Sequence, residues 1–190
     1  MDAQATTAAP DPDGQAPVPA ELQPVLGDVP TTVSIDQLVG HPSREQLVDV
    51  VRRARDAGYW QCTDLTAVDQ VANANRAPLP EGVEPERFEV VVHLMNFEQH
   101  RRLRLRVQVP ETDPTCPSLV DLHPGAEAME REVYDMFGIT FGSHPDMTRI
   151  LMPDDWDGHP LRKDYAMGKI PVQFKETPAD QEHRSGKGAR

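Results

Sequence analysis

Residues 87–109, RFEVVVHLMNFEQHRRLRLRVQV, decide the fold of this chain. Apolar side chains alternate onto both faces of the first half, which is typical of a central strand that is covered on both sides. The second half alternates strictly between apolar and polar residues. A link at residues 96–100 joins the two halves, and we predict a β-hairpin. The predicted faces are Phe88, Val90, Val92 and Leu94 against Val91, Met95 and Phe97 in the first strand, and Leu103, Leu105, Val107 and Val109 against Arg102, Arg104, Arg106 and Gln108 in the second.

The arginines of the second strand lie close enough together to suggest a phosphate-binding surface. The chain as a whole, however, has 19 Lys and Arg against 31 Asp and Glu, a net charge of -12. Such a chain is poorly suited to nucleic acid or to an anionic lipid surface. We therefore interpret the arginine face as solvated, or as facing a partner protein whose carboxylates it binds.

The segments on either side of the hairpin supply two helices. Ser43 and Gln46 form a capping-box pattern before an apolar helical stripe, and Gly58 marks the end of that helix. Residues 59–68 are predicted as a further strand, and the Pro- and Asn-rich residues 70–86 as a loop. Residues 127–137 have the apolar spacing of a second helix, which Gly138 ends.

The rest of the chain divides by composition. Residues 1–30 contain six prolines among small and polar residues, and we predict a disordered N-terminal tail. Residues 139–175 contain four prolines and three glycines but also large apolar side chains, so we predict an extended segment that docks onto another protein. Residues 176–190 mix charge with glycine and are predicted to be a disordered C-terminal tail.

These elements predict the α+β class. We expect one two-layer domain over residues 31–138, in which a mixed β-sheet carries its helices on one face. The extended C-terminal docking segment at residues 139–175 follows this domain. A length of 190 residues suits one such domain with its extensions.

The sequence contains no cofactor-binding pattern. Cys62 and Cys116 lack the CxxC spacing of zinc and iron–sulfur sites, and we interpret them as reduced, small apolar residues. Glycine-rich nucleotide loops and nucleophile motifs are also missing. There is neither an apolar run of membrane-spanning length nor a secretory pattern, so we expect a cytoplasmic chain without direct membrane insertion.

Three motifs in the second half of the chain identify a family. EREVYDMFGI at residues 130–139 is followed by HPDM at 144–147 and by GHPLRKDY at 158–165. This succession resembles the C subunit of bacterial NADH-quinone oxidoreductase (respiratory complex I), the 30 kDa-type subunit of the peripheral arm. The resemblance runs from about residue 33 to 175, and a string as long as GHPLRKDY is very specific. Ala128, Thr148 and Ala166 depart from the residues that the family usually has.

The resemblance implies a subunit without chemistry of its own. In the family, the C subunit packs beside the D subunit, which helps to form the quinone site, and the B subunit is a further neighbour. The complex passes electrons from NADH through FMN and iron–sulfur clusters, all held by other subunits, to quinone and translocates protons. We therefore expect a peripheral location at the cytoplasmic face of the cell membrane, and no catalytic, cofactor-binding or metal-binding residues.

Residues of the matching motifs are candidates for a partner interface. Charges of alternating sign along an extended segment suit charge-assisted hydrogen bonds, and the aromatic and aliphatic side chains between them supply buried area. The predicted interface residues are Glu130, Arg131, Glu132, Asp135, His144, Arg149, Trp156, His159, Leu161, Arg162, Lys163, Asp164 and Tyr165.

Acid–base catalysis is one alternative for the helical part of these motifs. Glu130, Glu132 and Asp135 are carboxylates that could shift one another's pKa. Because Glu132 and Asp135 are neighbours at i, i+3 and Arg131 lies beside them, an ion-paired helix face is the preferred interpretation.

A free-standing metal-dependent enzyme is a second alternative. His144, Asp146, His159 and Asp164 offer nitrogen and oxygen ligands, although a histidine before a proline in a turn is more often structural. A third alternative keeps the assembly role, because a homologous subunit serves membrane-bound hydrogenases and complexes fed by other electron donors.

Overall fold

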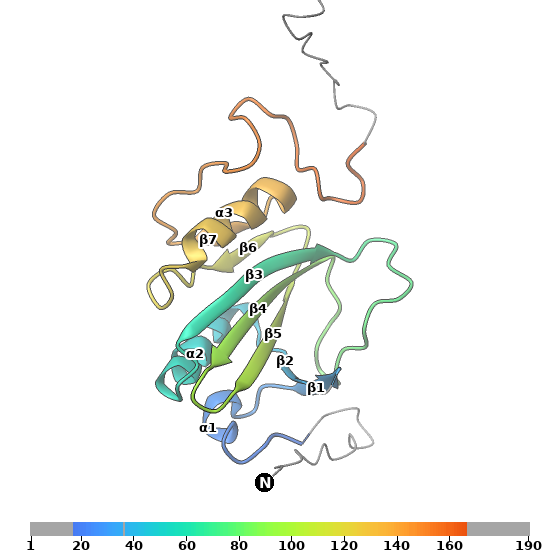
Figure 1. Cartoon of the computed structure of the whole chain (residues 1–190). Coiled ribbons are helices and arrows are strands. Elements are labelled where there is room, and N and C mark those ends of the chain that lie inside the picture. Colours follow the sequence, from blue (N-terminus) through green and yellow to red (C-terminus); the bar gives the residue numbers. More distant parts are fainter. Residues whose placement is uncertain (1–16, 36, 167–190) are drawn as a thin grey trace, which may run out of the picture.

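The structure of this chain is a computed structural model, and it describes residues 17–35 and 37–166. Within these residues, the strands form a five-stranded sheet in the order β1-β2-β5-β4-β3 and a small sheet of β6 and β7 (Figure 1). The large sheet is mixed, because β2 runs parallel to β5 and the other neighbours are antiparallel. The elements are α1 (Gln23–Leu26), β1 (Thr31–Ser34), β2 (Gln37–Gly40), α2 (Arg44–Asp56), β3 (Gln61–Asp69), β4 (Phe88–Asn96), β5 (Arg101–Val109), β6 (Thr115–Pro117), α3 (Ala126–Phe137) and β7 (Thr140–Gly142).

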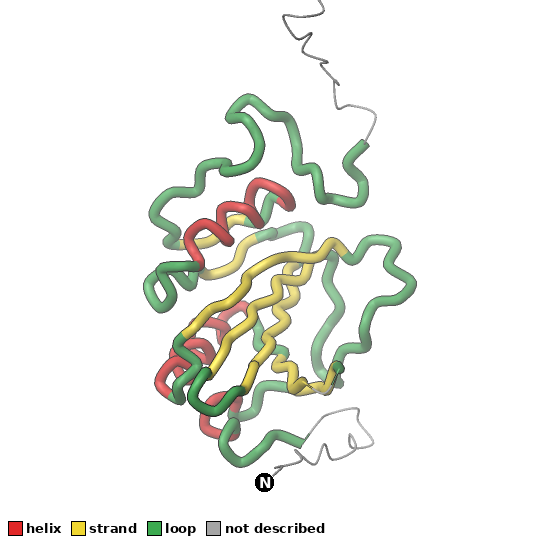
Figure 2. Tube along the Cα trace, viewed as in Figure 1, coloured by secondary structure: helices red, strands yellow, loops and turns green. Residues whose placement is uncertain are grey.

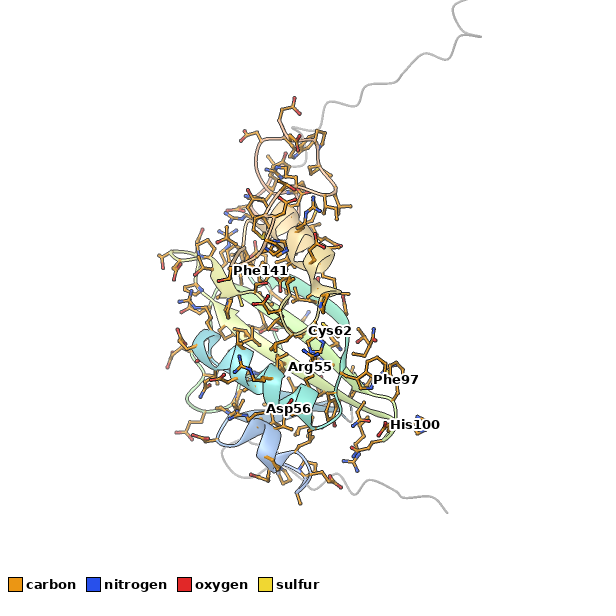
Figure 3. All side chains as sticks on the ribbon, turned by 90° about the vertical axis from the view of Figure 1, so that its left-hand side faces the viewer. Arg55, Asp56, Cys62, Phe97, His100 and Phe141 are labelled. Carbon is orange, nitrogen blue, oxygen red and sulfur yellow. The ribbon has the colours of Figure 1, made fainter. Side chains whose placement is uncertain are left out.

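The predicted hairpin is confirmed as β4 and β5. They pair in continuous register from Phe88 opposite Val109 to Asn96 opposite Arg101, and the apolar face predicted for each strand is 0% exposed. The other face of β4 is less covered than predicted, because Val91 and Met95 are half-buried and Phe97 is 47% exposed. Phe97 lies at the tip of the hairpin with His100 (Figure 3).

The helices cover one face of the large sheet, as predicted. The capping box of α2 is present: the Gln46 amide donates to Ser43 Oγ at 3.3 Å, and the Ser43 amide donates to Gln46 Oε1 at 3.0 Å. Leu47, Val50 and Val51 of α2 are at most 1% exposed. They belong to the same core as the inner face of the sheet and the apolar faces of α1 and α3. Figure 2 shows the two layers, with helices in red and strands in yellow.

The arginine face of β5 is partly an internal ion-pair layer, which corrects the expectation that it is solvated or binds a partner. Arg106 is 7% exposed and donates to both carboxylate oxygens of Glu89 on β4, at 2.6 and 2.9 Å. The loop between β3 and β4 covers this pair, since Arg76 lies 3.9 Å from Glu89. A buried bidentate pair is satisfied within the chain, so it has no capacity left for a partner's carboxylates. Arg102 remains exposed.

The prediction of a disordered tail up to residue 30 is wrong for its last part. Leu22, Val25, Leu26 and Val29 are between 0% and 5% exposed and belong to the core. Their spacing of i, i+3, i+4 and i+7 is that of a helical stripe, which the surrounding prolines conceal. α1 is short, but it brings these side chains against α2, where Arg53 Nε donates to the Val25 carbonyl at 2.9 Å. Residues 1–16 lie outside the described residues.

The folded domain extends beyond residue 138. Ile139 is 0% and Phe141 3% exposed, and β7 pairs with β6 in parallel. The first residues of the predicted docking segment therefore belong to the domain's own core. Among the described residues, no helix has the length and apolar character to cross a membrane. The predicted C-terminal tail, residues 176–190, lies outside the described residues.

Candidate functional site

Residues 144–166, which we call the C-terminal strap, arch over α3 without forming a helix or strand of their own (Figure 1, orange). Nine of the thirteen predicted interface residues lie in the strap and the other four lie in α3. The structure therefore brings the predicted residues together. Many of their contacts are with one another, inside the chain.

Asp135 fastens the strap to α3. Its side chain is 0% exposed, and Oδ2 accepts the backbone N–H groups of Ile150, Leu151 and Met152 at 3.1, 2.8 and 2.8 Å. Arg149 donates to Oδ1 at 2.5 Å. Burial acts to raise the pKa of Asp135, but these four donors outweigh it and hold the pKa below its ordinary value of 3.8. The ionised carboxylate is thus stabilised in place.

The strap also caps the C-terminal end of α3. The last turn of α3 has no basic residue of its own, and helix ends leave carbonyl groups that favour donors and positive charge. Strap residues supply both. The Asp135 carbonyl accepts from Arg149 at 3.3 Å and His159 Nδ1 at 3.0 Å, the Met136 carbonyl from the Leu161 amide at 3.0 Å, and the Phe137 carbonyl from Arg162 Nε at 2.6 Å.

Gly138 makes this close approach possible, and its replacement by alanine should weaken it. Gly138 has a φ of +73°, and a Cβ there would lie 2.5 Å from His159 Nε2 and 2.7 Å from Arg162 NH2. We expect Gly138→Ala to lower the free energy of unfolding by about 1–2 kcal/mol from the left-handed backbone, and further because both side chains must move. Urea unfolding measures this. Gly125→Ala, with a φ of -65° and open space around its Cβ, is the control, and equal losses in both variants would contradict the prediction.

Arg87, which directly precedes β4, ties the far end of the strap to the sheet. It donates to Asp69 Oδ2 at 3.0 Å and to Asp164 of the strap at 2.8 Å, and it also pairs with Glu111. Asp69 in turn accepts the Lys163 amide at 2.9 Å. The guanidinium groups of Arg87 and Arg162 both lie over the Phe88 ring, 4.9 and 5.1 Å from its centroid.

Glu130 has a different, purely internal role. It is 0% exposed, and it accepts the Leu119 amide on Oε1 and the Ser118 hydroxyl on Oε2, each at 2.7 Å. Burial, the largest effect, raises the pKa of Glu130 above its ordinary 4.5, although both hydrogen bonds act to lower it. The residue holds the loop before α3 against the helix.

The raised pKa of Glu130 predicts that this residue lowers the free energy of unfolding by an amount that depends on pH. The unfolded chain ionises this carboxyl near pH 4.5, whereas the folded chain does so at higher pH. Stability therefore falls as pH rises from about 4.5 through the folded pKa. We expect the wild type to lose stability relative to Glu130→Gln over this window, as followed by urea unfolding at several pH values. A difference between the two proteins that does not change with pH would contradict this.

The structure places the predicted interface residues at very different depths. Glu130 and Asp135 have no exposed surface to offer a partner, so their predicted interface role is corrected to an internal one. Arg131 binds Thr148 Oγ1 at 2.8 Å within the chain and is half-buried. For the residues with exposed surface, an interface role stays a prediction; these residues are Arg131, Glu132, His144, Arg149, Trp156, His159, Leu161, Arg162, Lys163, Asp164 and Tyr165.

Three large apolar side chains of the strap are exposed. Ile150, Leu151 and Leu161 are 41%, 55% and 48% exposed, while the backbone of each donates to the α3 anchor groups described above. They are three of the eight large apolar residues that are exposed in the described part of the chain. Rigidly held apolar side chains that face outward are typical of a docking surface.

The residues of the metal-site hypothesis have separate structural partners. His144 Nε2 lies 3.1 Å from the Glu127 carbonyl and its Nδ1 accepts the Asp146 amide, His159 binds the Asp135 carbonyl, and Asp164 pairs with Arg87. Over residues 17–35 and 37–166, no group of three or more His, Cys, Asp or Glu is arranged to hold a metal ion. The acid–base group is also dispersed, because Glu132 is exposed while Glu130 and Asp135 point into different internal networks.

Sequence reasoning missed Arg87 and Asp69 as site residues. They come from the facing ends of neighbouring strands and contact two distant strap residues. Asp69 accepts the Lys163 amide, 94 positions away, and Arg87 donates to Asp164, 77 positions away. One signal was present: an Asp and an Arg at the ends of apolar strands are charges that must find partners when buried.

The fold is one of small α+β domains found in multi-subunit respiratory complexes. The structure is similar to a trypsin-resistant fragment of Nqo5, with a TM-score of 0.54 and 32% identity over 62% of this chain and 89% of that one. It is also similar to a chain of an archaeal membrane-bound sulfane sulfur reductase, a respiratory membrane complex, with a TM-score of 0.62 and 25% identity over 83% and 92%.

The family model described as "Respiratory-chain NADH dehydrogenase, 30 Kd subunit" matches residues 41–171, and the chain belongs to this family. The C subunit of the NADH-quinone oxidoreductase from Herpetosiphon aurantiacus is 57% identical over 78% of this chain and 77% of its own length. The corresponding C subunit from Saccharopolyspora erythraea is 40% identical over 81% of this chain. The match covers only 60% of that relative's length.

Proposed function

We propose that this chain is a non-catalytic structural and assembly subunit in the peripheral arm of a proton-translocating NADH-quinone oxidoreductase. The observation that carries the proposal is the strap: its polar groups fix it to α3, to Asp69 of β3 and to Arg87, while Ile150, Leu151 and Leu161 remain exposed. A segment that is fixed by hydrogen bonds to its own domain and keeps apolar side chains exposed suits a preorganised docking surface.

The chemistry of the parent complex is assigned to other subunits. In this proposal electrons pass from NADH through FMN and iron–sulfur clusters to quinone without touching the chain, which binds none of these cofactors. Cys62 and Cys116 support this assignment, because both are buried and burial, the largest effect, raises the pKa of each thiol, to about 11 and about 12. Thiols of this kind are poor metal ligands and poor nucleophiles.

The proposed partners are the D subunit, which helps to form the quinone site, and the B subunit. The chain would be held at the cytoplasmic face of the cell membrane through these partners. In this proposal it does not insert into the membrane and does not bind nucleic acid. Family membership and the names of the relatives support the choice of complex.

A tagged chain tests the proposal. Membranes are solubilised gently, the chain is recovered through its tag, and the associated proteins and NADH-to-quinone activity are measured. Recovery with the D, B and flavin-carrying subunits and with activity supports the proposal. A chain recovered alone, carrying stoichiometric metal or hydrolytic activity, would refute it in favour of the free-standing enzyme.

A second candidate is the equivalent subunit of a related membrane-bound complex with another electron donor or acceptor. The likeness to a chain of the archaeal sulfane sulfur reductase favours it, since that fold match covers 83% of this chain. The same purified complex separates the two candidates. NADH oxidation that depends on a co-purified flavin subunit supports the first, and its absence with full recovery of the other subunits supports the second.

A further inference from the structure

The outer face of the large sheet, which the helices leave open, is covered at one end only. At the covered end, Glu89 and Arg106 lie under the loop between β3 and β4 and are 3% and 7% exposed. Toward the hairpin tip the arginines of the same face become more accessible, since Arg104 is half-buried and Arg102 is exposed. In the described part of the chain, the tip end of this face is therefore open to a partner.

Two exposed aromatic side chains stand at this open end. Trp60, directly before β3, and Phe97, directly after β4, are 54% and 47% exposed, and their ring centroids lie 5.5 Å apart. Figure 3 shows Phe97 at the hairpin tip, on the side of the molecule away from α2. Met95, two positions before Phe97, is half-buried on the outer face. Large apolar side chains that gather on an open face are typical of a protein contact.

Arg102 adds an uncompensated positive charge to this end. It lies directly opposite Met95 in the register of the hairpin, and it forms no ion pair or side-chain hydrogen bond with the described residues. Neither Glu98 of the turn nor Asp64 of β3 pairs with it. Arg104, by contrast, donates to a side chain of β2 at 3.2 Å. We call Trp60, Met95, Phe97 and Arg102 the tip surface.

The tip surface and the strap lie at opposite ends of the sheet. The strap is tied to Arg87 and Asp69, which lie at the start of β4 and the end of β3. Trp60 and Phe97 flank the other ends of the same two strands, each of which is nine residues long. One contact at the strap therefore leaves the tip surface free for a second one.

We propose that the tip surface docks a segment of a partner subunit that carries an aspartate or glutamate beside a large apolar side chain. The apolar side chain would cover Trp60 and Phe97, and the carboxylate would pair with Arg102. Trp, Phe, Met and Arg are the residue types enriched in protein interfaces, and the unpaired guanidinium selects an acidic segment by charge complementarity. The proposal rests on the assembly role given above, because it needs a partner subunit.

Single-stranded nucleic acid is the other class of ligand that uses aromatic and arginine side chains on a sheet. The net charge of -12 opposes it, because the phosphates would be repelled by the rest of the chain. A protein segment brings a single carboxylate to Arg102 and avoids this repulsion. The observations therefore favour the protein partner.

Site-directed photocross-linking in the purified complex tests the inference. Phe97 of the tagged chain is replaced by the photoreactive amino acid p-benzoylphenylalanine, the complex is recovered as above and irradiated, and mass spectrometry identifies the joined peptides. We expect a product with another subunit, at a peptide that contains Asp or Glu. Adding Arg102→Glu should lower its yield about tenfold, because attraction becomes repulsion. Exchange of the identified partner acid for lysine should then restore the yield.

Arg52→Glu is the matched control, because it makes the same change of charge at an arginine of α2 that is 54% exposed. It should leave the yield unchanged, and circular dichroism should show the wild-type Tm for both variants. An equal loss in the control, or no loss in Arg102→Glu, would overturn the inference. So would a product with nucleic acid, a product within this chain only, or no product from a complex that contains the other subunits. A tagged chain recovered alone would instead refute the proposed function, and this inference with it.

Discussion

Asp135→Ala should release the C-terminal strap from the domain. The substitution leaves three backbone N–H groups and the half-buried Arg149 without the carboxylate that they share. Removing one member of a buried charged pair typically costs about 3–5 kcal/mol. We expect this cost to appear mainly as local opening of the strap, since the strap contributes few fully buried side chains to the core.

Hydrogen exchange measures this opening directly. The amides of Ile150, Leu151 and Met152 donate to Asp135 in the wild type, and their protection should fall by about a hundredfold or more in the variant. Asp155→Ala is the matched control, because Asp155 lies in the same strap, is exposed, and makes no hydrogen bond with the described residues. Unchanged protection in Asp135→Ala, or an equal loss in the control, would show that the strap is held in another way.

Arg87→Ala should lower the free energy of unfolding more than any other substitution at the contact between the strap and the sheet. Its side chain is 9% exposed and that of Asp69 is 0% exposed, so the substitution leaves a buried carboxylate with only backbone donors. Burial acts to raise the pKa of Asp69, and hydrogen bonds from Arg87, Lys163 and Val71 together lower it. We expect a loss of about 3–5 kcal/mol in the free energy of unfolding, which is on the order of 10 °C in Tm.

Two further variants make the Arg87 prediction specific. Arg87→Ala/Asp69→Asn should recover part of the loss, because the second change removes the buried charge that the first leaves unpaired. Arg52→Ala is the control, since Arg52 and its partner Asp49 are 54% and 69% exposed and an exposed pair contributes little. Thermal unfolding followed by circular dichroism compares them. If Arg52→Ala lowered Tm as much as Arg87→Ala, burial of the ion pair would not be the cause.

The hydrogen-bond networks of Asp69 and Asp135 predict that acid destabilises the fold. The folded-state pKa values of Asp69 and Asp135 lie below their ordinary 3.8, so their stabilising effect is present above that value and is lost as pH falls through the lower folded values. The pKa of Glu130 is shifted in the opposite direction, so its effect on stability also changes in the opposite direction with pH. Acid release of the strap should therefore begin below about pH 4, whereas the cost of Glu130 appears above its unfolded pKa of 4.5.

The central elements of the fold could be predicted because their patterns are long and local. β4, β5 and α2 each repeat an apolar spacing over at least nine residues, so the period shows which side is buried. β1, β2, β6 and β7 span three or four residues each, which is too short for a period to be visible. α1 was missed for a related reason, since its prolines dominate the composition and hide the spacing from Leu22 to Val29.

The sequence predicted most residues of the site, but it did not predict which groups they contact. Alternating charges in the strap indicate many ion pairs, but they do not show whether the partner is the same chain or another. Asp135 and Arg149 are 14 positions apart, Arg87 and Asp164 are 77 apart, and both pairs form inside the chain. Long-range pairs of this kind depend on how the strap folds back over α3, which no local pattern encodes.

The central claim is that the exposed apolar side chains of the strap dock a partner subunit. The most direct test is Leu151→Asp/Leu161→Asp in a tagged chain, with Val71→Asp as the control, because Val71 is 41% exposed on a loop outside the strap. We predict that the double variant keeps the wild-type Tm but is recovered without the other subunits and without NADH-to-quinone activity, while Val71→Asp is recovered with both. Full incorporation of the double variant would contradict the claim.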